Sequence, residues 1–191
     1  MFKTEGIKLE DNFIIAQVTS GNTNAYRFLV LRYQKPLFKY LKSFGFNSSI
    51  VEEIAQETFI KAFTNLNGFD KEQSRFSTWL FVVAKNTALN ELSRHAYKKE
   101  MTFKEFPEIE SNSSPISAYE EGEQKANLGE LMKELPIQFR NALTLFHLNE
   151  MSLDEISQIE NCSLGTVKSR IHRAKEMLKN LIKQKYGTEG L

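Results

Sequence analysis

An apolar stripe near the C-terminus restricts the fold most. Val167, Ile171, Ala174, Leu178 and Leu181 recur at intervals of three and four residues, which places them on one side of an α-helix. Such a stripe must pack on other apolar faces, and segments 136–149 and 152–160 are the nearest candidates. The stripe therefore predicts a packed group of helices in the last third of the chain.

Helical periodicity also runs through the rest of the sequence. It predicts helices over 11–21, 23–45, 48–66, 77–99, 128–135, 136–149, 152–160 and from 164 onward. Only 9 glycines and 4 prolines interrupt 191 residues, and no β-type alternation is sustained. The expected fold class is therefore all-α.

Local signals mark where some of these helices begin or are disturbed. Ser49 with Glu52, and Ser152 with Glu155, have the spacing of a capping box and predict two helix starts. Pro36 lies inside the second helix and predicts a bend there, or a break near Lys35.

The charge pattern divides the chain into domains. Residues 101–126 carry six acidic and two basic side chains, whereas the whole chain has a net charge of only +1. Within this stretch, "EFPEIESNSSPISAYEEGEQ" is polar, serine-rich and without a sustained apolar period. We expect a flexible acidic linker at 101–126 that joins one small helical domain (1–100) to a second (127–191).

Cysteine content and hydropathy indicate a cytoplasmic protein. Cys162 is the single cysteine, so an internal disulfide and a thiolate metal cluster are both excluded. The sequence contains no apolar run of signal-peptide or membrane-span length. We therefore expect no membrane insertion.

The most distinctive local pattern is a basic helix that follows a short turn. Residues 163–186 hold seven Lys/Arg and one acidic side chain, and only "NCS" (161–163) lies between the helix at 152–160 and the helix that follows. This arrangement is typical of a helix-turn-helix, whose second helix enters the major groove of DNA. The alternative is that these side chains form a basic face that is simply exposed to solvent. The helix dipole stabilises cations near a helix C-terminus.

A second stripe lies in the expected helix at 77–99. Trp79, Asn86, Asn90 and Arg94 fall on one side of that helix. Aromatic rings can stack on unpaired bases and amides can read base edges. Trp79 alone fits a core position equally well, but two amides on a buried face would need polar partners. The stripe therefore favours a solvent-facing or nucleic-acid-facing surface.

A third surface combines acidic and apolar side chains on the helix at 48–66. Its members are Glu53, Gln56, Glu57 and Ile60, which could bind a protein or form a solvated face. A carboxylate metal site is disfavoured because no Glu-x-x-His pattern accompanies them. No nucleophile elbow, P-loop or zinc-ligand pattern occurs, so we expect no catalytic residue, metal, cofactor or small-molecule substrate.

Three segments in order resemble a known family. "IVEEIAQETFIKAFTNLNGFD", "SRFSTWLFVVAKNTALNEL" and "SLDEISQIENCSLGTVKSRIHRAKEML" are similar to the extracytoplasmic-function group of bacterial sigma-seventy factors. The resemblance implies two helical domains. The first binds core RNA polymerase and melts the downstream (minus-ten) promoter element. The second reads the upstream (minus-thirty-five) element in duplex DNA through its helix-turn-helix.

The resemblance also assigns residues by position. It implies core polymerase binding by Glu53, Gln56, Glu57 and Ile60. It implies contacts with the melted downstream strand by Arg75, Ser77, Trp79, Asn86, Asn90 and Arg94. It implies contacts with the upstream element by Ser163, Thr166, Lys168, Ser169, Arg170, His172, Arg173 and Lys175. Family members are commonly held inactive by an anti-sigma factor, so such a partner is expected as well.

Two other functions fit parts of the sequence. A free-standing helix-turn-helix regulator would bind duplex DNA without polymerase and would use the stripe at 79–94 as core. An enzyme that used the carboxylates at 52–57 would depend on a metal. Transcription with core polymerase discriminates among the three.

Overall fold

The computed structural model describes residues 10–102 and 128–186, with the side chains of 95–102 left aside. In these ranges the chain is helical and forms no strand, so the all-α prediction is confirmed. Residues 103–126, most of the expected linker, lie outside the described part. None of the described helices is long and apolar enough to span a bilayer.

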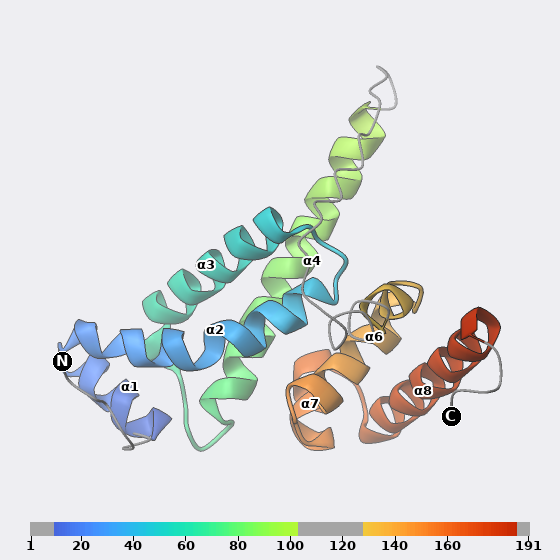
Figure 1. Ribbon diagram of the computed structural model, residues 1–191. Coiled ribbons are helices and arrows are strands. Elements are labelled where there is room, and N and C mark those ends of the chain that lie inside the picture. Colours follow the sequence, from blue (N-terminus) through green and yellow to red (C-terminus); the bar gives the residue numbers. More distant parts are fainter. Residues whose placement is uncertain (1–9, 103–127, 187–191) are drawn as a thin grey trace, which may run out of the picture.

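Two groups of helices lie side by side (Figure 1). The first comprises α1 (Asp11–Thr19), α2 (Tyr26–Lys42), α3 (Ser48–Thr64) and α4 (Phe76–Thr102), with short 3-10 turns at Thr23–Ala25 and Leu66–Gly68. The second comprises a short helical segment at 128–133, α6 (Ile137–Leu143), the π-helical turn η3 (Thr144–Leu148), α7 (Leu153–Glu160) and α8 (Leu164–Tyr186).

The expected break near Lys35 is wrong, because α2 continues through Pro36. Proline removes one backbone hydrogen bond and crowds the preceding turn. Leu37, Tyr40 and Leu41, which follow it, are 0 % exposed. Burying these three side chains requires the helix to continue, so tertiary packing outweighs the local cost.

The two predicted capping boxes have different outcomes. At α7 the box is present: Glu155 N donates to Ser152 Oγ at 3.2 Å and Ser152 N donates to Glu155 Oε2 at 2.9 Å. The box predicted at Ser49 is wrong, because Asn47 is the N-cap of α3 and its Oδ1 accepts from Ile50 N at 3.0 Å. Asparagine caps as well as serine does, and the helix begins two residues earlier than its sequence signal.

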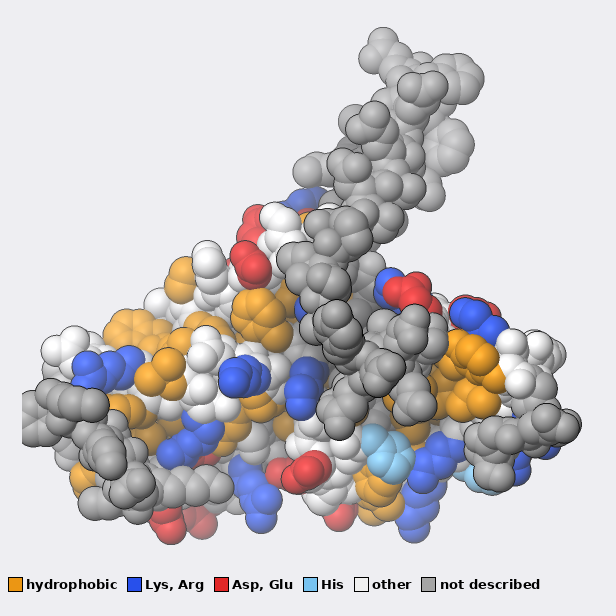
Figure 2. Space-filling view, viewed as in Figure 1, with side chains coloured by type: hydrophobic (Ala, Val, Ile, Leu, Met, Phe, Trp, Pro, Cys, Tyr) orange, Lys and Arg blue, Asp and Glu red, His pale blue; other side chains and the backbone are white. Residues whose placement is uncertain are grey.

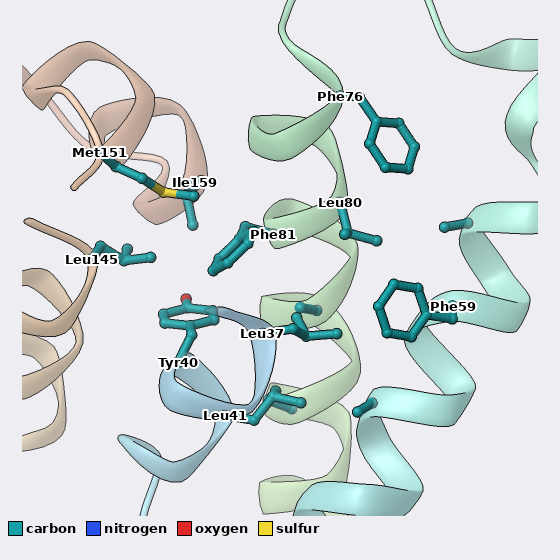
Figure 3. Close-up of a cluster of buried hydrophobic side chains, with 14 of the residues drawn as sticks. Leu37, Tyr40, Leu41, Phe59, Phe76, Leu80, Phe81, Leu145, Met151 and Ile159 are labelled. Atoms are coloured by element: carbon teal, nitrogen blue, oxygen red, sulfur yellow. The ribbon is translucent and has the colours of Figure 1, made fainter. Parts of the chain in front are cut away.

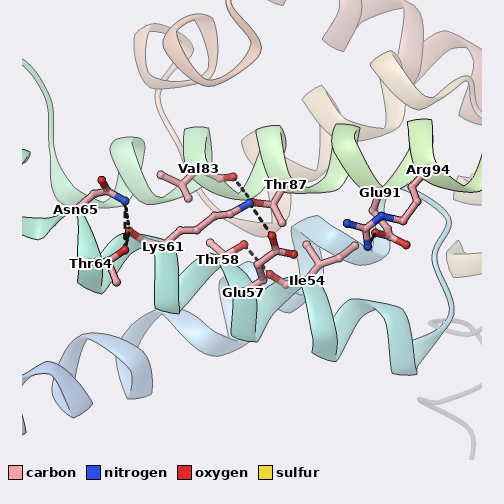
Figure 4. Close-up of polar contacts among 10 residues, drawn as sticks. All are labelled: Ile54, Glu57, Thr58, Lys61, Thr64, Asn65, Val83, Thr87, Glu91 and Arg94. Carbon is pink, nitrogen blue, oxygen red and sulfur yellow. Dashed lines mark hydrogen bonds and ion pairs between the residues drawn. The ribbon is translucent and has the colours of Figure 1, made fainter.

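A polar bridge joins α3 to α4 inside the first group (Figure 4). Lys61 Nζ on α3 donates to Thr87 Oγ1 on α4 at 3.3 Å and pairs with Glu57 at 2.7 Å. Thr87 is buried and its hydroxyl also donates to the Val83 carbonyl at 3.0 Å. The bridge satisfies polar groups between two helices that otherwise pack through apolar side chains.

The buried side chains of both groups form one contiguous core. Tyr40 on α2 and Phe81 on α4 point toward Leu145, Met151 and Ile159 of the second group (Figure 3). Tyr40, Phe81 and Leu145 are each 0 % exposed. The contact between the groups is therefore packed like a domain interior.

Buried polar side chains complete this contact. Arg140 on α6 is 9 % exposed; its Nε donates to the Ser43 carbonyl at 2.5 Å and its Nη1 to the Lys133 carbonyl at 2.9 Å. The Ser43 hydroxyl and the Asn141 amide are hydrogen-bonded at 2.8 Å. Burial lowers the pKa of Arg140, though a guanidinium stays charged. These bonds fix the end of α2 against α6.

We predict that Leu80→Ala, at a site 0 % exposed on α4, lowers the free energy of unfolding by about 2–5 kcal/mol. The loss combines the buried apolar surface with the cavity left behind. Leu89→Ala on the same helix, at a site 43 % exposed, is the matched control and should change stability far less. Urea denaturation followed by circular dichroism measures both, and equal losses would contradict the placement of α4.

Candidate nucleic-acid interface

The second group of helices contains a helix-turn-helix. Helix α7 ends at Asn161, which has a left-handed backbone with φ of 50°. Ser163 then caps α8, because Thr166 N donates to Ser163 Oγ at 3.2 Å. The predicted stripe on α8 is confirmed where it enters the core: Val167, Ile171 and Ala174 are buried.

Burying that stripe turns the opposite side of α8 to solvent. Lys168, Ser169, His172 and Arg173 are exposed, and Lys and Arg side chains gather over the start of α8 (Figure 2). Lys175 is also exposed, with its ammonium 5.7 Å from the centre of the Phe146 ring. The first turns of α8 therefore present cations and short polar groups, as a helix that reads the major groove requires.

Three side chains predicted to bind the upstream element are otherwise engaged here. The hydroxyls of Ser163 and Thr166 are 2.9 Å apart and serve the cap of α8. Arg170 has a side chain only 22 % exposed, and its Nη1 lies 3.5 Å from Glu160 Oε2 and 3.7 Å from Cys162 Sγ. The structure therefore separates Arg170 from the outward face of α8.

The stripe on α4 is mostly exposed. Asn86, Asn90 and Arg94 face solvent, so these amides need no buried partners. Arg94 pairs with Glu91 at 2.9 Å on the same helix (Figure 4). A single side of α4 thus offers two amides and a cation to a ligand.

Trp79 occupies the edge of an aromatic cluster at the start of α4. It is half-buried, and its ring centroid lies 5.4 Å from that of Phe69 and 5.7 Å from that of Phe76. Ser77 nearby is also half-buried. The position of Trp79 agrees in part with the core interpretation and in part with the base-stacking interpretation. One part of the ring packs in the cluster, and another part remains accessible.

The loop before α4 is built around Asp70. Its Oδ1 accepts from Glu72 N at 2.9 Å and its Oδ2 from the Gln73 amide at 3.0 Å, which makes a compact turn. Arg75 at the end of this loop has a side chain 81 % exposed and lies 3.5 Å from Glu155 of α7. The loop is therefore tied to the helix-turn-helix.

The face predicted to bind polymerase lies on α3. Glu53, Gln56 and Ile60 are exposed, with Ile60 64 % accessible. Glu57 is half-buried and pairs with Lys61. The structure thus brings the four predicted residues onto one helical surface with an apolar residue among acids.

Sequence reasoning missed the contacts that two acidic residues of α7 make with the first group of helices. Glu155 accepts from Thr78 Oγ1 at 3.4 Å and pairs with Arg75. Glu160 accepts from the Tyr40 hydroxyl at 3.1 Å and lies 3.8 Å from Lys85 Nζ. Tyr40 and Glu160 are 120 residues apart in the chain, and no local sequence pattern can predict a contact between such distant residues.

Known proteins resemble the chain in sequence over almost its whole length. The family model described as "Sigma-70 region 2" matches residues 29–97, and "Sigma-70, region 4" matches 125–178. The chain is 33% identical over 184 residues to the ECF RNA polymerase sigma-E factor of Escherichia coli K12, covering 92% of this chain and 95% of the relative. It is 32% identical over 178 residues to the RNA polymerase sigma-H factor of Pseudomonas aeruginosa, covering 88% and 92%.

Solved structures share the fold. CnrH in complex with the cytosolic domain of CnrY superposes with a TM-score of 0.68 at 24% identity, covering 92% of this chain and 98% of that one. The sigma factor RpoE of Bartonella quintana, in complex with the anti-sigma factor NepR, gives 0.69 at 21% identity, covering 84% and 98%. At these identities the likeness concerns the fold alone.

Glu155 should make folding stability depend on pH. Burial raises the pKa of Glu155, but hydrogen bonds from the Ser152 backbone and hydroxyl, the Arg75 charge and the Thr78 hydroxyl outweigh it, so the pKa falls below its ordinary value of 4.5. A lowered pKa stabilises the folded chain above the unfolded-state value, and this contribution is lost as the pH falls through the folded-state value. We predict that the stability difference between the wild type and Glu155→Gln shrinks as the pH falls below about 4.5.

Urea denaturation at neutral and acidic pH measures this difference. Glu134→Gln, which removes an exposed carboxylate, is the control and should show a small difference that changes little with pH. A Glu155→Gln difference that stayed constant across the same range would contradict the stabilising role of the ionised carboxylate.

Proposed function

Because the chain belongs to the extracytoplasmic-function group of sigma-70 factors, we propose how its parts divide the work of a sigma factor. Residues 1–100 hold core RNA polymerase and the melted downstream element. Residues 127–191 read the upstream element in duplex DNA, and 101–126 join the two. The protein is an RNA polymerase sigma factor, which directs core polymerase to promoters.

The outward face of α8 is the observation that best supports the upstream assignment. Its cations can neutralise phosphates and set the register on the duplex, while a few side chains select bases. Arg173 and Lys168 suit guanine N7 and O6, and His172 and Ser169 offer shorter polar contacts. The burial of Val167 and Ile171 on the other side keeps this face toward solvent.

The exposed stripe on α4 supports the downstream assignment. Removing a base from the stack costs a few kcal/mol. Stacking of that base on an aromatic side chain contributes about 1–3 kcal/mol in return. Trp79, braced by Phe69 and Phe76, is such a platform. Asn86 and Asn90 lie further along α4 and can bond base edges of the same unpaired strand.

The α3 surface supports binding of polymerase. Ile60 is a large exposed apolar residue among Glu53, Gln56 and Glu57, and an apolar centre with a polar rim is typical of protein interfaces. We also propose an anti-sigma factor as a second protein partner, a cytoplasmic location and no enzymatic activity of the chain itself. The structure of RpoE from Bartonella quintana with the anti-sigma factor NepR supports the partner proposal by shared fold.

Run-off transcription with purified core polymerase tests the function. Promoter-specific transcripts should appear only when this chain is added. Tight binding to duplex DNA without transcripts would instead support a free-standing regulator, and metal-dependent activity lost in Glu53→Ala would support an enzyme.

We predict that Arg173→Ala abolishes upstream-element recognition and leaves polymerase binding intact. Arg173 is exposed on the outward face of α8, and loss of a bidentate base contact costs about 1–3 kcal/mol. A promoter gel shift with holoenzyme, paired with co-purification with core polymerase, measures both properties. Lys133→Ala, at an exposed cation outside the reading helix, is the control, and equal loss of both properties in Arg173→Ala would argue for misfolding.

We expect Asn86→Ala to fail at promoter opening while retaining the closed complex. The amide is exposed on α4, where a truncated side chain loses contacts to the unpaired strand and leaves the fold unchanged. Permanganate reactivity of promoter thymines reports opening, and a gel shift reports the closed complex. Reactivity equal to that of the wild type would remove Asn86 from the downstream interface.

A further inference from the structure

We propose that Tyr33 on α2 is a positioning residue for Trp79. The Tyr33 ring braces the aromatic cluster of Phe69, Phe76 and Trp79, and Asp11 on α1 holds the Tyr33 ring in place. The proposal deepens the proposed function and rests on it, because it concerns how the platform for an unpaired base is kept in one orientation. Tyr33 acts through Phe76 and needs no contact with DNA of its own.

Asp11 fixes the outer end of the Tyr33 side chain. The Tyr33 hydroxyl donates to Asp11 Oδ2, and Asp11 Oδ1 accepts from Arg32 Nη1. Asp11 lies in the first turn of α1, where the helix dipole favours a carboxylate. Burial, together with the bond to Asp11 and its charge, raises the pKa of Tyr33, so the hydroxyl remains a donor. α1 therefore anchors this side chain of α2 through a charge-assisted hydrogen bond.

The ring of Tyr33 packs against Phe76. Their ring centroids are 5.6 Å apart, with the planes inclined at 57°. Phe76 is 2 % exposed, and its centroid lies 5.7 Å from that of Phe69 and 5.7 Å from that of Trp79. Aromatic pairs at these distances attract one another in preferred orientations. The position of the Tyr33 ring therefore restricts the position of Phe76 and, through it, that of Trp79.

α1 also reaches the cluster by a second route. It contacts the 3-10 turn Leu66–Gly68, and Phe69 follows this turn directly. Phe69 and Phe76 are the residues on either side of the loop 70–75, so α1 supports both ends of that loop. Binding surfaces need side chains whose rotamers are locked by the packing behind them. Trp79, which is half-buried, has this packing on the side of Phe69 and Phe76.

The cluster is separate from the contact between the two groups of helices. Phe76 and Phe81 point to different sides of α4, and Phe81 is the one that points toward the second group (Figure 3). A change at Tyr33 should therefore alter the surroundings of Trp79 and leave the helix-turn-helix unaffected.

The test uses the full-length chain, in which Trp79 is the single tryptophan, so that tryptophan fluorescence reports this position alone. Tyr33→Phe removes only the hydroxyl that donates to Asp11 and keeps the ring. Tyr33→Leu removes the ring as well. We expect acrylamide to quench Trp79 more strongly in Tyr33→Phe than in the wild type, and most strongly in Tyr33→Leu. The fluorescence anisotropy of Trp79 should fall in the same order.

Tyr26→Phe is the matched control on the same helix. The Tyr26 hydroxyl donates to the Phe59 carbonyl at 2.8 Å, and the Tyr26 ring contacts Phe63 with centroids 5.0 Å apart. This variant should lower the urea midpoint, because a buried hydrogen bond is lost, and should leave the quenching of Trp79 unchanged. Equal changes in quenching for Tyr26→Phe and Tyr33→Phe would show a general loss of packing and would overturn the proposal.

Promoter opening is the functional readout. Holoenzyme with Tyr33→Phe should open a promoter that the wild type transcribes about three- to tenfold more slowly, the factor expected for the loss of one hydrogen bond. Binding of core polymerase and formation of the closed complex should be unchanged. Permanganate reactivity of promoter thymines over time measures opening, and a gel shift measures the closed complex.

A double-variant cycle tests whether Asp11 acts on Trp79 through Tyr33. Asp11→Ala removes the acceptor of the Tyr33 hydroxyl, so adding Tyr33→Phe to it should change neither quenching nor opening any further. Additive effects of the two substitutions would contradict this route. The proposal is also overturned if neither Tyr33 variant changes the quenching of Trp79, or if the quenching changes while promoter opening does not.

Failure of this proposal is distinguishable from failure of the proposed function. If the wild type supports promoter-specific run-off transcription but the Tyr33 variants open the promoter normally, only the positioning role is lost. If the wild type gives no core-dependent transcript, the proposed roles of the surfaces are lost instead, whatever the quenching of Trp79 shows.

Discussion

The structure depends on an apolar seam between its two groups of helices. Tyr40 and Phe81 on one side meet Leu145 and Ile159 on the other, all at 1 % exposure or less. Tyr40 also makes a polar contact across the seam, because its hydroxyl donates to Glu160. Burial, together with the neighbouring charge of Glu160, raises the pKa of Tyr40, so the hydroxyl remains a donor. The seam fixes where α7 sits, and α7 in turn fixes the direction in which α8 faces solvent.

Local periodicity predicted the helices well because helix formation and one-sided burial are short-range properties. The stripe from Val167 to Ala174 and the cap at Ser152 needed no knowledge of distant segments. Two local predictions failed for physical reasons that the sequence does not display. Asn47 competes with Ser49 for the same capping role and lies nearer to the start of the helix. Pro36 is tolerated because the residues that follow it are needed in the core.

The candidate surfaces were predictable to the extent that exposure follows from helix geometry. Asn86 and Asn90 face solvent for the same reason that their helix buries its other side. The partners of charged side chains were not predictable, since Lys85 meets the carbonyl of Ile159 across 74 residues of sequence. Arg170 illustrates the difference. Its place in a basic segment predicts a phosphate contact, whereas its helical angle directs it toward Glu160 and the turn.

Charged pairs at the edge of an apolar seam differ from apolar contacts, because each charge needs a partner of opposite sign. The side chain of Glu160 is only 6 % exposed, and loss of one partner of a buried pair is costly because it leaves an uncompensated charge. Exposing Phe81 or Leu145 instead costs the full apolar transfer energy. Apolar residues at positions 155 and 160 would extend the seam but would remove the acceptors of the Thr78 and Tyr40 hydroxyls. Glutamates there keep α7 in register with α2 and α4, because Glu160 accepts from Tyr40 and Glu155 accepts from Thr78.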